Sequence, residues 1–113
     1  MSWETICNYE EIPENAGLAA LVEGHQIAIF KVRGELYAID NFDPIGKANV
    51  LSRGIVCSVK DEICVASPLY KQHFSLGSGR CLEEEGVTVG CFEVRHNNGV
   101  IEVDKSPLKL RAA

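Results

Sequence analysis

Five cysteines are the residues of this 113-residue sequence best suited to bind a metal ion or to act as nucleophiles. They are Cys7, Cys57, Cys64, Cys81 and Cys91, and none stands two or three residues from another. Structural zinc sites and most iron–sulfur sites use such close pairs, because a tight loop then holds two thiolates together. No metal site is therefore predicted from a local motif, whereas a site assembled from distant cysteines stays open.

The surroundings of the cysteines favour a packing role. No histidine forms a Cys-x-His or Cys-x-x-His pattern with any cysteine, and no base adjoins one to activate it as a nucleophile. Cys57, Cys64 and Cys91 are interpreted as core residues, since a free thiol in an apolar strand behaves as a small hydrophobic group. An odd number of cysteines with no secretory leader ahead of them predicts reduced thiols in a cytoplasmic protein.

Composition and charge narrow the class of protein further. The length fits one domain, and 46% hydrophobic residues with a mean hydropathy of +0.01 are typical of a globular protein rather than a membrane protein. The net charge of −5 disfavours nucleic acid as a partner. Residues 1–104 are predicted to form the domain and residues 105–113 a basic tail, usually a solvated end but also a possible secondary docking element.

Short apolar runs between turn signals predict an all-β fold. One helical turn is expected at Asn8–Pro13, and Asn97-Asn98-Gly99 is a strong signal for a β-hairpin turn. The expected strands are Trp3–Cys7, Leu18–Glu23, Gln26–Arg33, Glu35–Asp40, Gly54–Lys60, Ile63–Ala66, Val87–Arg95 and Val100–Val103.

Two long segments, Asn41–Arg53 and Ser67–Gly79, interrupt the strands. Each is rich in proline and glycine, and each begins where a predicted strand ends. Loops held at strand ends are where functional groups are usually presented. The two segments are therefore the predicted location of a functional site.

The motifs of these segments resemble the cluster-binding loops of Rieske ferredoxins. The octapeptide Ser67-Pro68-Leu69-Tyr70-Lys71-Gln72-His73-Phe74 stands where the family has Cys-Pro-x-His-Gly-x-x-Phe. The triplet Asn41-Phe42-Asp43 stands in place of Cys-x-His, and Leu51-Ser52-Arg53-Gly54 retains the Leu-Ser-x-Gly that follows it. The resemblance implies a Rieske-like β-sandwich or partly open barrel of short antiparallel strands, with both segments as tip loops.

The four ligand positions of that family are all changed here. The resemblance places Asn41 and Ser67 at the cysteine positions and Asp43 and Tyr70 at the histidine positions. A Rieske cluster needs two thiolates and two imidazoles, whereas these residues offer hard oxygen donors. We therefore expect no catalytic residue, no metal and no cofactor in this chain.

Further motifs point to one branch of the family. Val65-Ala66-Ser67-Pro68, Ile39-Asp40-Asn41-Phe42 and the opening Trp3–Cys7 are similar to the small subunits of cytoplasmic, assimilatory NAD(P)H-dependent nitrite reductases. This resemblance implies a large catalytic subunit as partner. The large subunit would carry FAD, siroheme and a 4Fe–4S cluster and would reduce nitrite to ammonium.

The expected role is that of a non-redox accessory subunit whose tip loops dock on the large subunit. Prolines limit the entropy lost on ordering an interface, and apolar side chains beside polar ones suit a recognition patch. The residues predicted to dock are Phe42, Pro44, Leu69, Tyr70, Lys71 and Gln72.

Two other functions stay open at this level. One is a Rieske-type, ferredoxin-like electron carrier, with an unorthodox 2Fe–2S site held by cysteines brought together in space. The other is an enzyme in its own right, with Asp43 and Tyr70 as acid–base partners. The second has little support, because no further carboxylate or histidine stands at a recognisable spacing.

Overall fold

The computed structural model describes the backbone of residues 3–107 and the side chains of residues 3–104. Within this range the chain forms short strands and two 3-10 turns, η1 (Tyr9–Glu11) and η2 (Leu51–Arg53), as the all-β prediction requires. The strands are β1 (Trp3–Asn8), β2 (Ala16–Val22), β3 (His25–Val32), β4 (Glu35–Asp40), β5 (Phe42–Asp43), β6 (Ala48–Asn49), β7 (Ile55–Val59), β8 (Glu62–Ala66), β9 (His73–Ser75), β10 (Cys91–Asn97) and β11 (Val100–Pro107).

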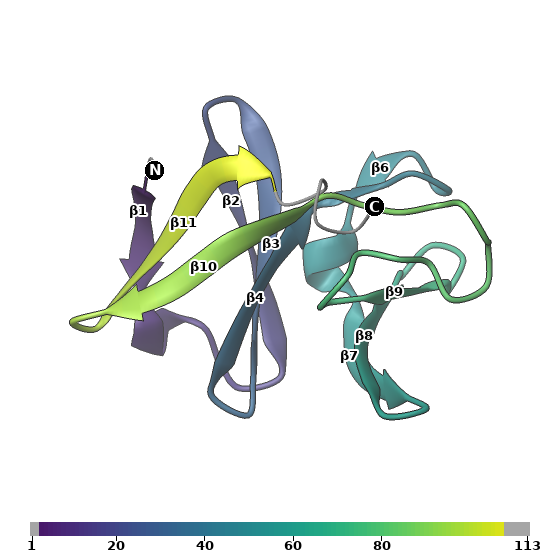
Figure 1. The fold of residues 1–113 in the computed structure, drawn as a ribbon, viewed down its shortest axis with the longest axis horizontal. Coiled ribbons are helices and arrows are strands. Elements are labelled where there is room, and N and C mark those ends of the chain that lie inside the picture. The colour runs from purple at the N-terminus through teal and green to yellow at the C-terminus, as the bar shows by residue number, and fades with distance from the viewer. Residues whose placement is uncertain (1–2, 108–113) are drawn as a thin grey trace.

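The strands form one long sheet, one short sheet and a small ribbon. The long sheet has the order β1-β11-β10-β4-β3-β2, and every neighbouring pair in it is antiparallel. The short sheet has the order β7-β8-β9, and β5 pairs with β6. Figure 1 shows the long sheet curled on one side of the molecule and the short sheet on the other. This arrangement is the partly open, barrel-like fold that the sequence predicts.

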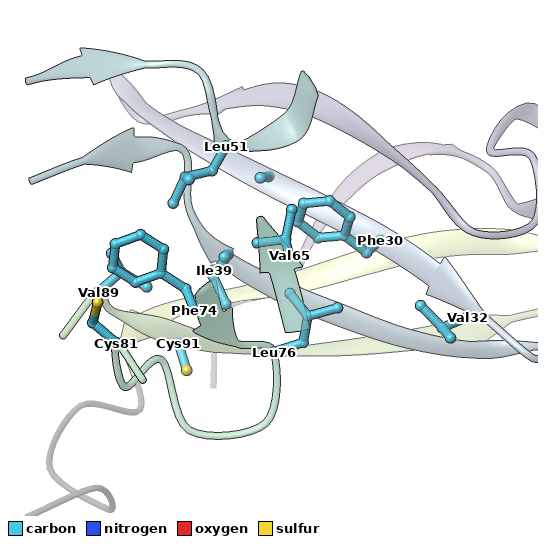
Figure 2. Packing of buried hydrophobic residues seen from close by; sticks show 11 residues of the cluster. Phe30, Val32, Ile39, Leu51, Val65, Phe74, Leu76, Cys81, Val89 and Cys91 are labelled. Carbon is cyan, nitrogen blue, oxygen red and sulfur yellow. The ribbon is translucent and has the colours of Figure 1, made fainter. Parts of the chain in front are cut away.

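Strand β3 is buried on both faces because its alternate residues enter two separate cores. Ile27 and Ile29 pack inside the curled sheet, against side chains of β1, β2, β10 and β11. Ala28, Phe30 and Val32 pack between the long and the short sheet. Figure 2 shows this second core, to which Phe30 from β3, Val65 from β8 and Phe74 from β9 all belong. The four apolar residues at positions 27–30 are therefore all required for packing.

Not every cysteine fills the core in the predicted way. Cys64 and Cys91 are buried as predicted, and Cys81 is buried as well. Cys57 is only half-buried, and Val56 is the residue of β7 that packs against the core. The face of β7 that packs against the core is therefore the one that contains Val56, and Cys57 lies on the opposite face.

Strand β10 begins at Cys91 and not at Val87 as predicted. The backbone of residues 87–90 instead bonds to a preceding loop, with Val89 N–H donating to Gly79 O at 2.8 Å and Cys81 N–H donating to Val87 O at 2.9 Å. These bonds satisfy the backbone of an apolar segment that the β-pattern assigns to a strand. The predicted hairpin therefore keeps its turn but has a shorter first strand.

The second predicted loop, Ser67–Gly79, contains a strand. β9 pairs with β8, with Phe74 opposite Val65. We therefore call Asn41–Arg53 the first tip loop and Ser67–Gln72 the second tip loop. The first contains the β5–β6 ribbon and η2, and β6 lies above β8 and β9 in Figure 1.

The last described strand crosses the predicted domain boundary at residue 104. β11 continues to Pro107, so the first residues of the predicted basic tail extend a strand. The rest of that tail lies outside the described residues. No helix in the described part of the chain is long and apolar enough to cross a membrane.

Candidate functional site

The first tip loop turns around the side chain of Asp43. Its Oδ1 accepts hydrogen bonds from the backbone N–H groups of Ile45 at 2.8 Å and Gly46 at 3.1 Å. The N–H of Lys47 donates to the backbone oxygen of Asp43 at 2.7 Å and closes the turn. Pro44 fixes the backbone at the first position inside the turn. A buried carboxylate thus organises residues 43–47.

The second tip loop repeats this geometry around Ser67. Its Oγ accepts a hydrogen bond from the N–H of Leu69 at 3.3 Å, and the N–H of Lys71 donates to its backbone oxygen at 3.0 Å. Pro68 takes the position that Pro44 takes in the first loop. Residues 67–71 therefore form the same five-residue turn as residues 43–47.

The two turns are joined at their first residues. Ser67 Oγ donates to Asp43 Oδ2 at 2.5 Å, and both side chains are at most 1% exposed. The turns also touch at Gly46, where an added Cβ would lie 2.4 Å from Leu69 Cδ1. We call the hydrogen bond the Asp43–Ser67 link. It joins two loops that are far apart in the sequence into one tip.

Asn41 anchors the tip to the long sheet. Its Nδ2 donates to Gln26 Oε1 on β3 at 3.0 Å, and its Oδ1 accepts from the N–H of Ser52 in η2 at 2.7 Å. Its backbone N–H also donates to the oxygen of Gln26 at 3.1 Å. All of these groups lie in or beside the first tip loop, so Asn41 has a structural role.

The remaining predicted residues lie at the surface of the tip. Phe42, Leu69 and Tyr70 are 42%, 43% and 64% exposed, and we call these three side chains the tip patch. Lys71 is exposed beside them. Gln72 is half-buried, and its Oε1 is a buried acceptor with no hydrogen-bond partner.

These residues do not fit a Rieske 2Fe–2S cluster. The Asp43 carboxylate already accepts three hydrogen bonds, Asn41 is bonded on both sides of its amide, and Ser67 donates to Asp43. All four side chains offer oxygen or amide donors where the cluster needs thiolates and imidazoles. The same burial and bonding keep Asp43 from reaching a substrate, which removes the basis for an acid–base pair with Tyr70.

The thiols are also unsuited to replace the missing ligands. Burial, followed by the nearby charge of Glu62, raises the pKa of Cys64 to about 11. Burial likewise raises the pKa of Cys7 and of Cys57, so these thiols are less reactive as nucleophiles than a free cysteine. Across the described residues, no three His, Cys, Asp or Glu side chains are grouped to hold a metal ion.

His73, at the end of the second tip loop, is bound to Glu83 instead. Its backbone N–H donates to Glu83 Oε1 at 2.7 Å, and its Nδ1 lies 2.6 Å from Oε2. Desolvation opposes ionisation of Glu83, but the hydrogen bonds and charge of His73 outweigh it and lower the pKa of that carboxyl. This contact fixes the point at which the chain leaves the tip and enters β9.

Several known proteins are similar to this chain in sequence and in fold. The family described as "Rieske-like [2Fe-2S] domain" matches residues 2–104. The nitrite reductase (NADH) small subunit of Salmonella typhimurium is 40% identical over 103 residues, which cover 89% of this chain and 95% of that protein. The chain belongs to the nitrite reductase small-subunit family.

Two further relatives place the family in context. The NMR structure of the Escherichia coli protein NirD has a TM-score of 0.86 and 38% identity to this small subunit, and the match covers 93% of this chain and 98% of that one. A protein of Klebsiella oxytoca named nitrite reductase [NAD(P)H] large subunit is 39% identical over 110 residues, which cover 97% of this chain but 12% of that protein.

Sequence reasoning found the small-subunit motifs but missed how the tip is built. The signal was present as a repeat, since Asp43-Pro44-Ile45-Gly46-Lys47 and Ser67-Pro68-Leu69-Tyr70-Lys71 share an acceptor, a proline, an aliphatic residue and a lysine at the same offsets. An Asp or Ser followed by proline favours a turn in which the Asp or Ser side chain accepts a hydrogen bond from the backbone N–H two residues later. The repeat predicts two equal turns, although not their mutual hydrogen bond.

Proposed function

We propose that this chain is the accessory subunit of a cytoplasmic NAD(P)H-dependent nitrite reductase, and that its tip docks on the large catalytic subunit. The observation that carries this proposal is the tip formed by two joined loops, with the exposed apolar side chains of the tip patch. In this proposal the chain holds no cluster, and FAD, siroheme and the 4Fe–4S cluster belong to the large subunit.

The exposed apolar residues support docking through the tip. Beside the tip patch, Ile55 is 71% exposed and pairs with Ala66, the residue before the second tip loop. Leu21 is 67% exposed and pairs with Gln26, whose side chain binds the first tip loop. Several of the large hydrophobic side chains that are exposed in the described part of the chain thus belong to the tip loops or to strand positions paired with residues beside them, and exposed apolar residues of this kind can form an interaction surface.

The Klebsiella relative supports the choice of partner. That protein is named a large subunit and contains within its own polypeptide a region similar to nearly the whole of this chain. A domain that is covalently part of a large subunit acts beside it. The corresponding free chain is therefore expected to assemble with a separate large subunit.

The test of the function is nitrite-dependent oxidation of NAD(P)H by the purified large subunit, with and without this protein. We expect turnover, or the stability of the large subunit during turnover, to rise when the chain is added, and the two proteins to co-purify. If the large subunit neither binds the chain nor responds to it, the proposal is wrong.

Replacing Tyr70 by alanine is expected to weaken the complex by about tenfold or more, because aromatic side chains at the centre of an interface carry a large share of its binding energy. Binding is measured by titration of the large subunit. Tyr70→Phe is the matched control and should retain most of the affinity, since it keeps the ring. The free variants should unfold at the same temperature as the native chain, because Tyr70 is exposed. Equal affinity for native and Tyr70→Ala proteins would place the interface elsewhere.

The rival function as an electron carrier is tested by colour and metal content. We expect the chain, purified under anaerobic and reducing conditions, to show no visible absorbance and no stoichiometric iron or sulfide, because its tip lacks thiolate and imidazole ligands. Absorbance spectra and iron analysis measure this directly. A reproducible brown chromophore with iron and sulfide in equal amounts would support the carrier and contradict a cluster-free subunit.

A further inference from the structure

Two lysines in the tip have a backbone conformation that disfavours lysine. Lys47 has a φ of 62° and Lys71 a φ of 64°, and each is the last residue of its five-residue turn. In this left-handed region the Cβ of an L-residue crowds the backbone, so glycine is the usual residue. Other residues of the chain, Lys60 among them, also have a positive φ, so what distinguishes Lys47 and Lys71 is that they occupy the equivalent position in two joined turns.

The turns hold the two lysines in a fixed relation to each other. The N–H of each lysine is bonded to the first residue of its own turn, at 2.7 Å for Lys47 and 3.0 Å for Lys71. The first residues of the turns are bonded to each other by the Asp43–Ser67 link. The backbones of the two lysines are therefore already fixed relative to each other in the free chain. Less entropy is then lost when a partner binds.

The charge at the tip is opposite to that of the whole protein. The two tip loops contain three basic residues, Lys47, Arg53 and Lys71, and a single acid, Asp43. The basic residues are exposed and make no ion pair among the side chains of residues 3–104, whereas Asp43 is fully buried and hydrogen-bonded. The two tip loops of a chain with a net charge of −5 thus carry a local excess of positive charge.

We propose that Lys47 and Lys71 are recognition residues that pair with carboxylates on the large subunit, around an apolar contact made by the tip patch. This inference rests on the proposed function and adds the chemistry of the receiving surface, which is apolar at its centre and acidic at its rim. Such a rim orients the tip during encounter and repels the acidic remainder of the chain. It predicts association that weakens with salt.

The experiment compares lysine-to-glycine variants, because glycine removes the charge and suits the backbone. The double variant Lys47→Gly/Lys71→Gly is expected to bind the large subunit about tenfold more weakly at low ionic strength and to lose most of the salt dependence of binding. Its melting temperature should be no lower than that of the native chain, since the strained conformation is relieved. The double variant Lys47→Arg/Lys71→Arg keeps both charges and should bind the large subunit with the affinity and salt dependence of the native chain.

Lys60→Gly is the matched control. Lys60 also has a positive φ, of 50°, and is exposed, but it lies in the β7–β8 turn at the other end of the short sheet from the tip. This variant should leave both affinity and salt dependence unchanged.

The outcomes separate this inference from the proposed function. If the double glycine variant binds as tightly as the native chain at low salt, while Tyr70→Ala still weakens binding, the docking function stands and the lysine inference is wrong. The lysine inference is also wrong if the double arginine variant binds as weakly as the double glycine variant. It is wrong as well if the double glycine variant has a lower melting temperature than the native chain. If the native chain does not bind the large subunit at any salt concentration, the proposed function itself fails.

Discussion

Replacing Asp43 by alanine is expected to lower the free energy of unfolding by about 3 kcal/mol or more, because it leaves several buried donors without an acceptor. The carboxylate accepts from the N–H groups of Ile45 and Gly46 and from the hydroxyl of Ser67, and it is fully buried. Urea unfolding measures the change, followed by the fluorescence of Trp3, the single tryptophan of the chain.

Two milder variants separate the contributions to this loss. Ser67→Ala removes the Asp43–Ser67 link and the acceptor of the Leu69 N–H, and is expected to cost about 1–2 kcal/mol. Asp43→Asn keeps the shape and one acceptor oxygen, so its cost should fall below that of Asp43→Ala. Equal stability of the Asp43→Ala and native proteins would show that the link does not hold the tip together.

Replacing Phe74 by alanine is expected to cost about 3–5 kcal/mol, the usual range for removing a fully buried phenylalanine. Phe74 is 0% exposed, lies opposite Val65 in the short sheet and belongs to the core shared with the long sheet. A loss of this size is a large part of the 5–15 kcal/mol that stabilises a typical domain. The same urea titration measures it, and a reduced yield of folded protein is expected as well.

Phe74→Leu is the control for Phe74→Ala. Leucine fills most of the space, so a cost below about 1.5 kcal/mol is expected. Because β9 follows the second tip loop directly, Phe74→Ala should also weaken docking on the large subunit, whereas Phe74→Leu should not. If both variants are equally destabilised, shape within this core matters more than the volume removed.

The sequence was sufficient for elements whose pattern is local. Strand Glu35–Asp40 and the turn at Asn98-Gly99 agree with the structure, because alternation and turn residues act over a few positions. The start of β10 was wrong since Val87–Gly90 has the composition of a strand but finds its hydrogen bonds at Gly79 and Cys81. Such pairing depends on the tertiary fold.

Long-range contacts explain the other differences. The alternation of Ile55, Cys57 and Val59 is visible in the sequence, but which face of β7 meets the core depends on how the short sheet packs, and Val56 is the residue that does. The Asp43–Ser67 link joins residues 24 positions apart, so no local signal predicts it. The ligand-position assignments did locate the tip, although they did not show that two of those positions bond to each other.

The burial of β3 in both cores has a consequence for how the protein opens. Neither core can be exposed while β3 stays in place for the other, and the first tip loop is bonded to the same strand through Gln26 and Asn41. Proteins usually open in separate cooperative units, of which binding loops are the weakest. Here the tip is bonded to the strand at the centre of the domain, so we expect the tip to unfold together with the domain and not as a separate unit.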